Sequence, residues 1–327
     1  EADISIGLLG FGEFSAVMFL LMLVRLLIFF WGYELISKDR ENGTLKIIFA
    51  QGVQGLDLIW GRVSGLFLAS LSLVGLPLLL GFGLLFFQPE NDLLGQSLIQ
   101  YLLLAFAYLT YFLILALVSV LISAKSQSSK SSLTTLIGFW LLFTLVIPKV
   151  SQVLGQSFFP NPSKIEFDSA IEEEIIRQGD SHNPNDPYYA ALKDSLLRAY
   201  QVDSVQKLPF NYSGYVMREG EKLSTETYLN HQKKLQETFR NQQNVIRIAA
   251  WVNPFLAIKL ASMGLSGTDD AMYQSFKDQS ETFRYKLAQT MNNLQIELIS
   301  NRIKSSSDPS ARLTQDYWKS LPDFHQK

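Results

Sequence analysis

Apolar residues gather in four long runs in the first half of the chain. The runs extend from about Phe14 to Ile36, Leu58 to Phe87, Leu98 to Ala124 and Leu133 to Val153. A bilayer core about 30 Å thick needs roughly 20 apolar residues as a helix, so each run predicts a membrane span. We therefore expect residues 1–158 to form a helical transmembrane domain.

The pattern changes after residue 158. Apolar or bulky side chains recur at steps of three and four within residues 223–250 and 270–303. This spacing predicts two long amphipathic helices that pack on each other. A shorter helix is predicted from about Tyr188 to Gln201, after a turn-rich loop. We expect residues 159–327 to form a mainly helical globular domain, which makes the fold class an all-α membrane protein.

Residues 245–265 are apolar and long enough to span a membrane, but their composition argues against a span. They contain Arg247, Lys259 and a central Asn253-Pro254. A helix exposed to lipid must satisfy every backbone group, and a proline removes one donor. Two short helices broken at Asn253-Pro254, at the membrane surface or packed in the domain, are the favoured interpretation.

Basic residues are distributed unevenly among the loops. Loops 34–62 and 124–131 together hold six Lys and Arg, whereas the loop at 88–97 holds none. By the excess of positive charge in cytoplasmic loops, the first two are predicted to be cytoplasmic and residues 159–327 extracytoplasmic. The start of the chain then lies outside without a signal peptide, so we expect a further span upstream of this sequence.

Composition narrows the chemistry. The chain has no cysteine and a net charge of −2, so it offers no thiolate ligands and no strongly basic surface for nucleic acid. Its three histidines do not cluster, and it contains neither a His-Glu-x-x-His motif nor a phosphate-binding loop. We therefore predict no catalytic residue, no metal site and no cofactor in this chain. If ATP drives the protein, another chain must bind it.

The polar segment between the first two runs carries the most specific motif. It reads Glu41-Asn-Gly43-Thr44-Leu45, and Gly61-Arg62 follows where the next run begins. This order resembles the permease subunit of a type-2 ABC exporter, whose cytoplasmic loop has an acidic residue, Gly-Thr-Leu, a short helix and then Gly-Lys. Gln51-Gly52-Val53 stands where that family commonly has Thr-Pro-Val, which leaves the turn geometry open.

The second half resembles the extracytoplasmic region of a bacterial subgroup of these permeases, so the resemblance covers most of the chain. The shared elements are the Asn-Pro-x-Asp-x-Tyr-like loop at 183–188, Leu-Pro-x-Asn-Tyr-x-Gly at 208–214, Asn253-Pro254 with Ser262-Met263, Gly267-Thr268-Asp269 and Phe283-Arg284-Tyr285.

The resemblance implies a site and partners. The loop at 38–62 would couple the spans to a separate cytoplasmic ABC ATPase, which would bind ATP and Mg. The residues at this contact would be Glu41, Gly43, Thr44, Leu45, Gly61 and Arg62. Members have six spans, one before and one after those seen here. The permease would pair with a second copy or a related chain, as a homo- or heterodimer among lipids of the bacterial inner membrane.

Two further candidate sites carry alternative interpretations. Arg25 lies in the middle of the first run, where a charge indicates a pathway, a subunit interface, a structural ion pair or a span whose boundary lies elsewhere. The polar residues of the second half could shape an extracytoplasmic binding surface, or they could simply cap helices, which their types favour. These residues are Asn253, Pro254, Gly267, Thr268 and Asp269.

Two classes of function fit these observations. The first is a transport subunit, without an ATPase site of its own, that ATP hydrolysis in a partner would drive as an exporter. The second is a membrane-anchored sensor or scaffold whose outer domain binds a ligand or protein. An intramembrane enzyme ranks last, because the spans carry no acid–base pair and no metal motif. The sequence does not indicate the substrate.

Overall fold

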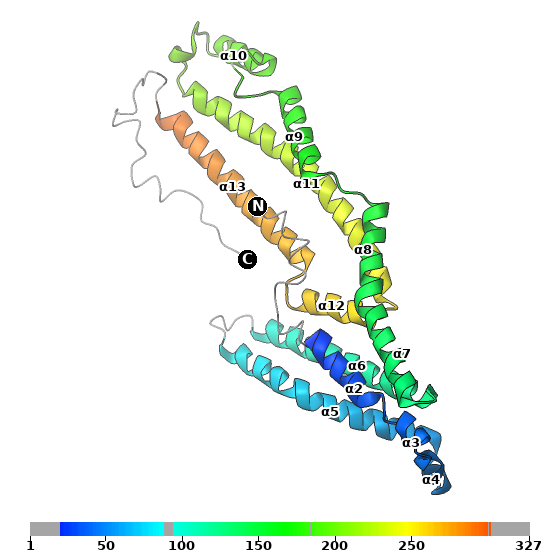
Figure 1. Cartoon of the computed structure of the whole chain (residues 1–327). Coiled ribbons are helices and arrows are strands. Elements are labelled where there is room, and N and C mark those ends of the chain that lie inside the picture. Colours follow the sequence, from blue (N-terminus) through cyan, green and yellow to red (C-terminus); the bar gives the residue numbers. More distant parts are fainter. Residues whose placement is uncertain (1–19, 88–93, 184, 300, 302–327) are drawn as a thin grey trace. The chain divides into compact units, whose positions relative to one another are not determined.

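A computed structural model describes residues 20–87, 94–183, 185–299 and 301. These residues form helices and connecting turns, with no strand in the part of the chain described (Figure 1). They divide into two compact units, one within Glu1–Ser157 and Gln243–Asp269, the other within Phe158–Gln242 and Asp270–Lys327. The expected second domain, residues 159–327, is therefore interrupted by a segment that belongs to the first unit.

The first unit contains most of the helices. They are η1 (Leu20–Val24), α2 (Arg25–Gly32), α3 (Ser37–Glu41), α4 (Thr44–Ala50), α5 (Gly55–Leu84), η2 (Leu85–Phe87), α6 (Leu94–Lys125), α7 (Ser129–Leu141), η4 (Leu142–Val146), α8 (Ile147–Phe158) and α12 (Pro254–Leu265). Here η1 and η4 are π-helical and η2 is a 3₁₀ turn.

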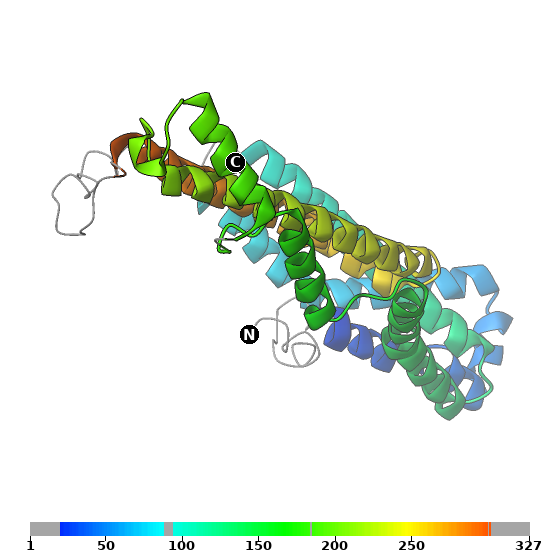
Figure 2. The same ribbon diagram turned by 90° about the horizontal axis from the view of Figure 1, so that it is seen from above.

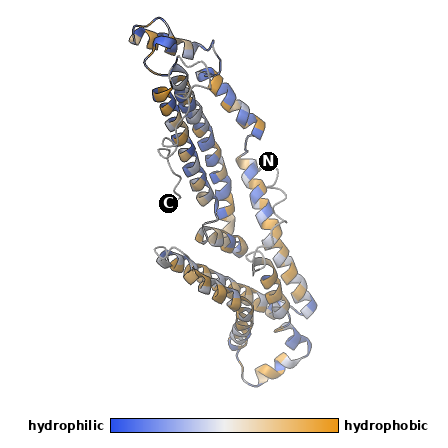
Figure 3. Ribbon diagram, turned by 90° about the vertical axis from the view of Figure 1, so that its left-hand side faces the viewer, coloured by the Kyte–Doolittle hydropathy of each residue, from blue (hydrophilic) through white to orange (hydrophobic). Residues whose placement is uncertain are grey.

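Three helical stretches of this unit are long and apolar enough to cross a membrane. They are Gly55–Phe87, Gly95–Lys125 and Ser129–Phe158, so three of the four apolar runs are confirmed as helices of spanning length. The long apolar segments appear orange in Figure 3, whereas the long helices of the second unit carry much blue. The run at 14–36 lies partly outside the described residues; its described part is η1 and α2, and α2 ends at Gly32.

The core of the first unit forms where α2, α5 and α7 pack around α6. Phe112 and Leu115 of α6, Ile28 of α2, Val63 of α5 and Leu136 of α7 are all fully buried. α2 approaches α6 closely at Gly32, where an added Cβ would come within 2.5 Å of the Ser119 Cβ. Small residues at such a crossing let two backbones approach, as is common between membrane helices.

The second unit contains α9 (Lys164–Gln178), α10 (Pro187–Ala199), η5 (Val205–Lys207), most of α11 (Tyr212–Ala250) and α13 (Asp270–Leu298). The predicted helix at 188–201 corresponds to α10. Asp186 caps it, because its carboxylate accepts the backbone N–H groups of Tyr188 at 2.9 Å and Tyr189 at 3.3 Å.

The two long helices of the second unit run antiparallel, side by side in both Figure 1 and Figure 2. Polar contacts join them: Arg284 pairs with Glu221 at 2.7 Å, and Gln236 donates to Gln274 at 3.0 Å. α11 begins eleven residues earlier than the predicted segment at 223. The reason is local, since the Asn211 side chain accepts the Gly214 N–H at 2.8 Å and initiates the helix there.

The ambiguous segment 245–265 does break at Asn253-Pro254, as predicted. Its first half is not a separate short helix, however, but the last turns of the 39-residue α11. Its second half is α12, which packs against α6 in the first unit. Of the two predicted placements, packing in the globular domain is wrong for α12, because α12 buries Phe255 and Ile258 in the core of the first unit. A position at the membrane surface stays a prediction.

Candidate functional site

The motif Glu41-Asn-Gly43-Thr44-Leu45 forms a sharp joint between two short helices. We call α3, Asn42, Gly43 and α4, residues 37–50, the elbow. Gly43 lies between the helices with φ of 75°, a left-handed conformation that a residue without Cβ adopts at little cost. A second left-handed glycine, Gly52 with φ of 89°, follows α4 and turns the chain into α5.

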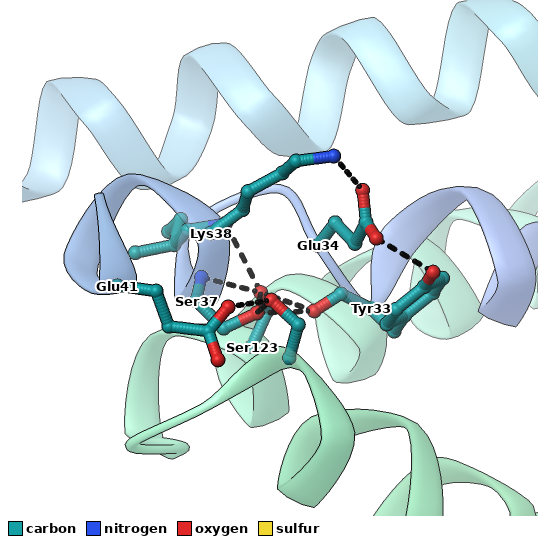
Figure 4. Close-up of polar contacts among 8 residues, drawn as sticks. Tyr33, Glu34, Ser37, Lys38, Glu41 and Ser123 are labelled. Carbon is teal, nitrogen blue, oxygen red and sulfur yellow. Dashed lines mark hydrogen bonds and ion pairs between the residues drawn. The ribbon is translucent and has the colours of Figure 1, made fainter. Parts of the chain in front are cut away.

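A serine from a different helix holds the start of the elbow (Figure 4). The Ser123 hydroxyl of α6 accepts the backbone N–H groups of Ile36 and Ser37, both at 3.0 Å. It donates in turn to the Tyr33 carbonyl at 2.8 Å. The first N–H groups of a helix lack partners within that helix. Ser123, which belongs to α6, therefore caps the start of α3.

The elbow also contacts the loop between α6 and α7. The Arg40 guanidinium donates to the carbonyl oxygens of Ser126 and of Ala124, the latter at 2.5 Å, and so satisfies carbonyls at the end of α6. The Glu41 carboxylate accepts the Ser129 hydroxyl at 2.6 Å, at the first residue of α7. The two basic loops, 34–62 and 124–131, therefore meet at the same end of the first unit.

Asp39 links the elbow to α5. Its carboxylate pairs with the Arg62 guanidinium at 2.8 Å and accepts the Thr44 hydroxyl at 3.2 Å. Leu45 packs against the core of the unit, whereas Gly61 is exposed and would have open space around an added Cβ. Of the motif residues, Glu41, Thr44, Leu45 and Arg62 thus have partners inside the chain, and Gly43 supplies the joint.

Sequence reasoning missed two exposed apolar residues of α4. Ile47 and Phe49 are 59% and 46% exposed, although they lie between polar and glycine-rich segments where water access is expected. Neither belongs to the motif, and neither contributes to a long apolar run. The signal that could have revealed them is the pair of bulky apolar residues in a loop rich in charge.

Arg25 is enclosed by the first unit. Its side chain is 2% exposed, and its guanidinium donates to the Thr144 hydroxyl. It lies 4.7 Å from the centre of the Phe255 ring and 5.9 Å from that of Trp140. No carboxylate pairs with it among the described residues, and its Nε has no hydrogen-bond partner there. Two aromatic faces and the Thr144 hydroxyl therefore surround its charge.

The polar residues of the second half mark the ends of helices. Asn253 is fully buried and caps α12, and Pro254 is the first residue of that helix. Gly267 follows α12 in the left-handed conformation with φ of 64°, and the Thr268 N–H donates to the Met263 carbonyl at 2.9 Å. Asp269 directly precedes α13. The structure thus distributes these five residues over the two ends of α12.

The described residues offer no further candidate metal site. Within the described residues no group of three or more His, Asp or Glu could hold a metal ion. The Glu174 carboxylate accepts a hydrogen bond from the His231 Nε2 at 2.6 Å in the second unit. His182 lies in the loop before α10, and His325 falls outside the described residues.

The fold defines a class first: a helical protein with three helices long and apolar enough to cross a membrane. Comparison with protein families then matches residues 164–327 to a family described as "Domain of unknown function (DUF3526)". The chain belongs to this family. A comparison of this chain with the curated proteins and with the solved structures finds no match.

Proposed function

We propose that this chain is the membrane-spanning subunit of an ATP-driven ABC exporter, and that a separate cytoplasmic ATPase drives it through the elbow. The observation that carries this proposal is the elbow itself: two short helices jointed at Gly43, with the apolar side chains of Ile47 and Phe49 exposed. In this proposal the chain lies in the bacterial inner membrane, the elbow is cytoplasmic and the second unit is extracytoplasmic.

The contacts of the elbow suit the transmission of force. Arg62 connects it to α5, Ser123 and the α6 carbonyls connect it to α6, and Glu41 connects it to α7. Each of these three helices belongs to a different one of the three candidate spans. A displacement of α4 by a partner would therefore act on all three spans, because polar contacts link them to a single short segment.

The partner would supply the chemistry that this chain lacks. The ATPase would bind ATP and Mg, and its docking surface would cover Ile47 and Phe49, since burial of apolar surface drives most protein association. A second permease copy or a related chain would complete the transport pathway between two subunits.

Purification from native membranes in mild detergent tests the proposal. We expect a stoichiometric ATPase subunit to accompany the wild-type chain and to be lost from the variant Ile47→Asp/Phe49→Asp. Ile165→Asp is the control, because Ile165 is an even more exposed apolar residue and lies in the second unit. A wild-type chain that purifies without any ATPase, or a double variant that retains it, would refute the proposal and favour a sensor or scaffold.

A further inference from the structure

Residues 248–253, where α11 ends and the chain turns into α12, carry exposed apolar side chains. We call this segment the corner. Trp251 is 90% exposed, Val252 71% and Ile248 70%. These three residues lie within five positions at the end of α11, so they form one patch and not scattered exceptions. In water such a patch is costly, and it indicates a surface that meets another apolar phase.

The corner is fixed to the candidate spans by two polar contacts. The Asn253 amide donates to the Phe143 carbonyl at 2.8 Å, in the stretch Ser129–Phe158. The Ser262 hydroxyl of α12 donates to the Tyr108 hydroxyl of α6 at 3.2 Å. α12 and the corner therefore move with the helices that cross the membrane, because both belong to the first unit.

The position of these contacts along the helices gives a depth. At a rise of 1.5 Å per residue, Phe143 lies about 21 Å along its helix from Ser129, and Tyr108 about 25 Å from Lys125. Both reference residues adjoin the basic loop at 124–131. Measured from Leu133 and Ala124, where the apolar runs meet the loop, Phe143 lies about 15 Å and Tyr108 about 24 Å into an apolar core about 30 Å thick. The corner and α12 therefore lie between the middle of the bilayer and its side remote from that loop.

The surface around the corner is also apolar. Leu142, Leu145 and Val146, next to Phe143 on the spanning helix, are exposed large hydrophobic residues. Arg247 and Lys259 are exposed on either side of the patch, and neither takes part in an ion pair within the described part of the chain. Apolar residues flanked by cations, with a tryptophan between them, are typical of a protein surface at the boundary of a bilayer.

We propose that this corner is a lipid-binding surface in the leaflet remote from the basic loops. Ile248, Trp251 and Val252 contact acyl chains, and Arg247 and Lys259 bind the phosphates of anionic headgroups. The occupant is membrane lipid rather than a protein, because the patch continues the apolar surface of the spanning helix. The inference depends on the spans crossing a bilayer but not on coupling to an ATPase.

Fluorescence of a single-tryptophan variant of the full chain tests the contact with acyl chains. The other four tryptophans, Trp31, Trp60, Trp140 and Trp318, are replaced by phenylalanine, and the monodisperse protein is reconstituted in vesicles of phosphatidylcholine and phosphatidylglycerol. We expect lipids brominated on the acyl chain to quench Trp251 strongly and aqueous iodide to quench it weakly. Strong iodide quenching would overturn the proposal, and so would a blue-shifted emission that brominated lipid leaves unchanged, which would indicate a protein partner.

The role of the two cations has a separate readout. Brominated phosphatidylglycerol should quench Trp251 more than brominated phosphatidylcholine, and Arg247→Gln/Lys259→Gln should abolish the difference. Lys233→Gln/Arg240→Gln is the control, since it removes two exposed cations of α11 that lie away from the corner. A difference that survives in the first variant, or disappears in the control, would overturn the headgroup assignment.

Discussion

The side-chain amide of Asn253 donates a hydrogen bond to the backbone carbonyl of Phe143. This carbonyl has no backbone donor within its own helix, because a proline stands at the donor position. Phe143 lies in the π-helical stretch η4, where the N–H of Ile147 bonds to Leu142. In this register the donor for Phe143 would be residue 148, but Pro148 has no N–H. The Asn253 amide supplies the missing donor, because a carbonyl without a hydrogen bond in apolar surroundings is costly.

Asn253→Asp should separate the two roles of this side chain. Aspartate can still cap α12, but it cannot donate to the Phe143 carbonyl. We expect a loss of about 1–3 kcal/mol in the free energy of unfolding, the typical cost of an unpaired buried polar group. Thermal unfolding of the full chain in detergent measures it. Pro148→Ala restores a backbone N–H, so the double variant should lose less than the single one, and equal losses would contradict this account.

Gly32→Ala should weaken the contact of α2 with α6. The new Cβ would come within 2.5 Å of the Ser119 Cβ, and overpacking of this kind costs about 1–3 kcal/mol. The same unfolding measurement detects it. Ser119→Gly removes the opposing atom, so it should recover part of the loss in the Gly32→Ala background; no recovery would show that the clash is not the cause.

Gly43 should tolerate only residues that accept a positive φ. We expect Gly43→Asn to leave the elbow intact, because asparagine enters the left-handed region more readily than other residues. Gly43→Trp should abolish ATPase activity coupled to transport in reconstituted vesicles while insertion into the membrane is unchanged. Tryptophan is strained at this positive φ, although nothing lies within 4 Å of an added Cβ, so it would disturb the elbow and a partner docked there but not the packed core of the spans. Normal coupling in Gly43→Trp would contradict the proposed function.

Arg25 should be replaceable by an apolar residue of similar size. It has no carboxylate partner among the described residues, so removal of its charge leaves no opposite charge unpaired. We expect Arg25→Met to unfold within about 1 kcal/mol of the wild type by this argument. Arg25→Lys should lose more, because a strongly hydrated ammonium stacks less well on Phe255 and Trp140. The opposite order in thermal unfolding would show that the positive charge itself is required.

The cap of α10 should fail in acid. The backbone N–H groups of Asp180, Tyr189 and Tyr188 hold the pKa of the Asp186 carboxyl below its ordinary value, although burial opposes this. A lowered pKa in the folded state means that the stabilisation is present above the unfolded-state pKa and is lost as the pH falls through the folded-state value. Amide exchange at Tyr188 and Tyr189, corrected for intrinsic rates, should rise at low pH in the wild type. Asp186→Asn should remove this dependence.

Periodicity and capping residues made much of this architecture predictable. Three runs of apolar residues indicate helices of spanning length because their composition alone decides that question. The break at Asn253-Pro254 and the start of α10 after Asp186 follow from local backbone chemistry. The sequence also marked Glu41, Gly43 and Arg62. The partner contact that the resemblance implies for them stays a prediction, and the structure adds contacts of Glu41 with α7 and of Arg62 with Asp39.

Sequence alone determined the long apolar helices, the break at Asn253-Pro254 and which loops carry positive charge, since these properties depend on neighbours along the chain. Only the tertiary structure decided that α12 joins the spanning helices and that Ser123 caps α3. It also decided that Arg25 is enclosed by aromatic rings. These contacts join residues tens to more than a hundred positions apart. They depend on which buried donor meets which unpaired acceptor, and no periodicity encodes that choice.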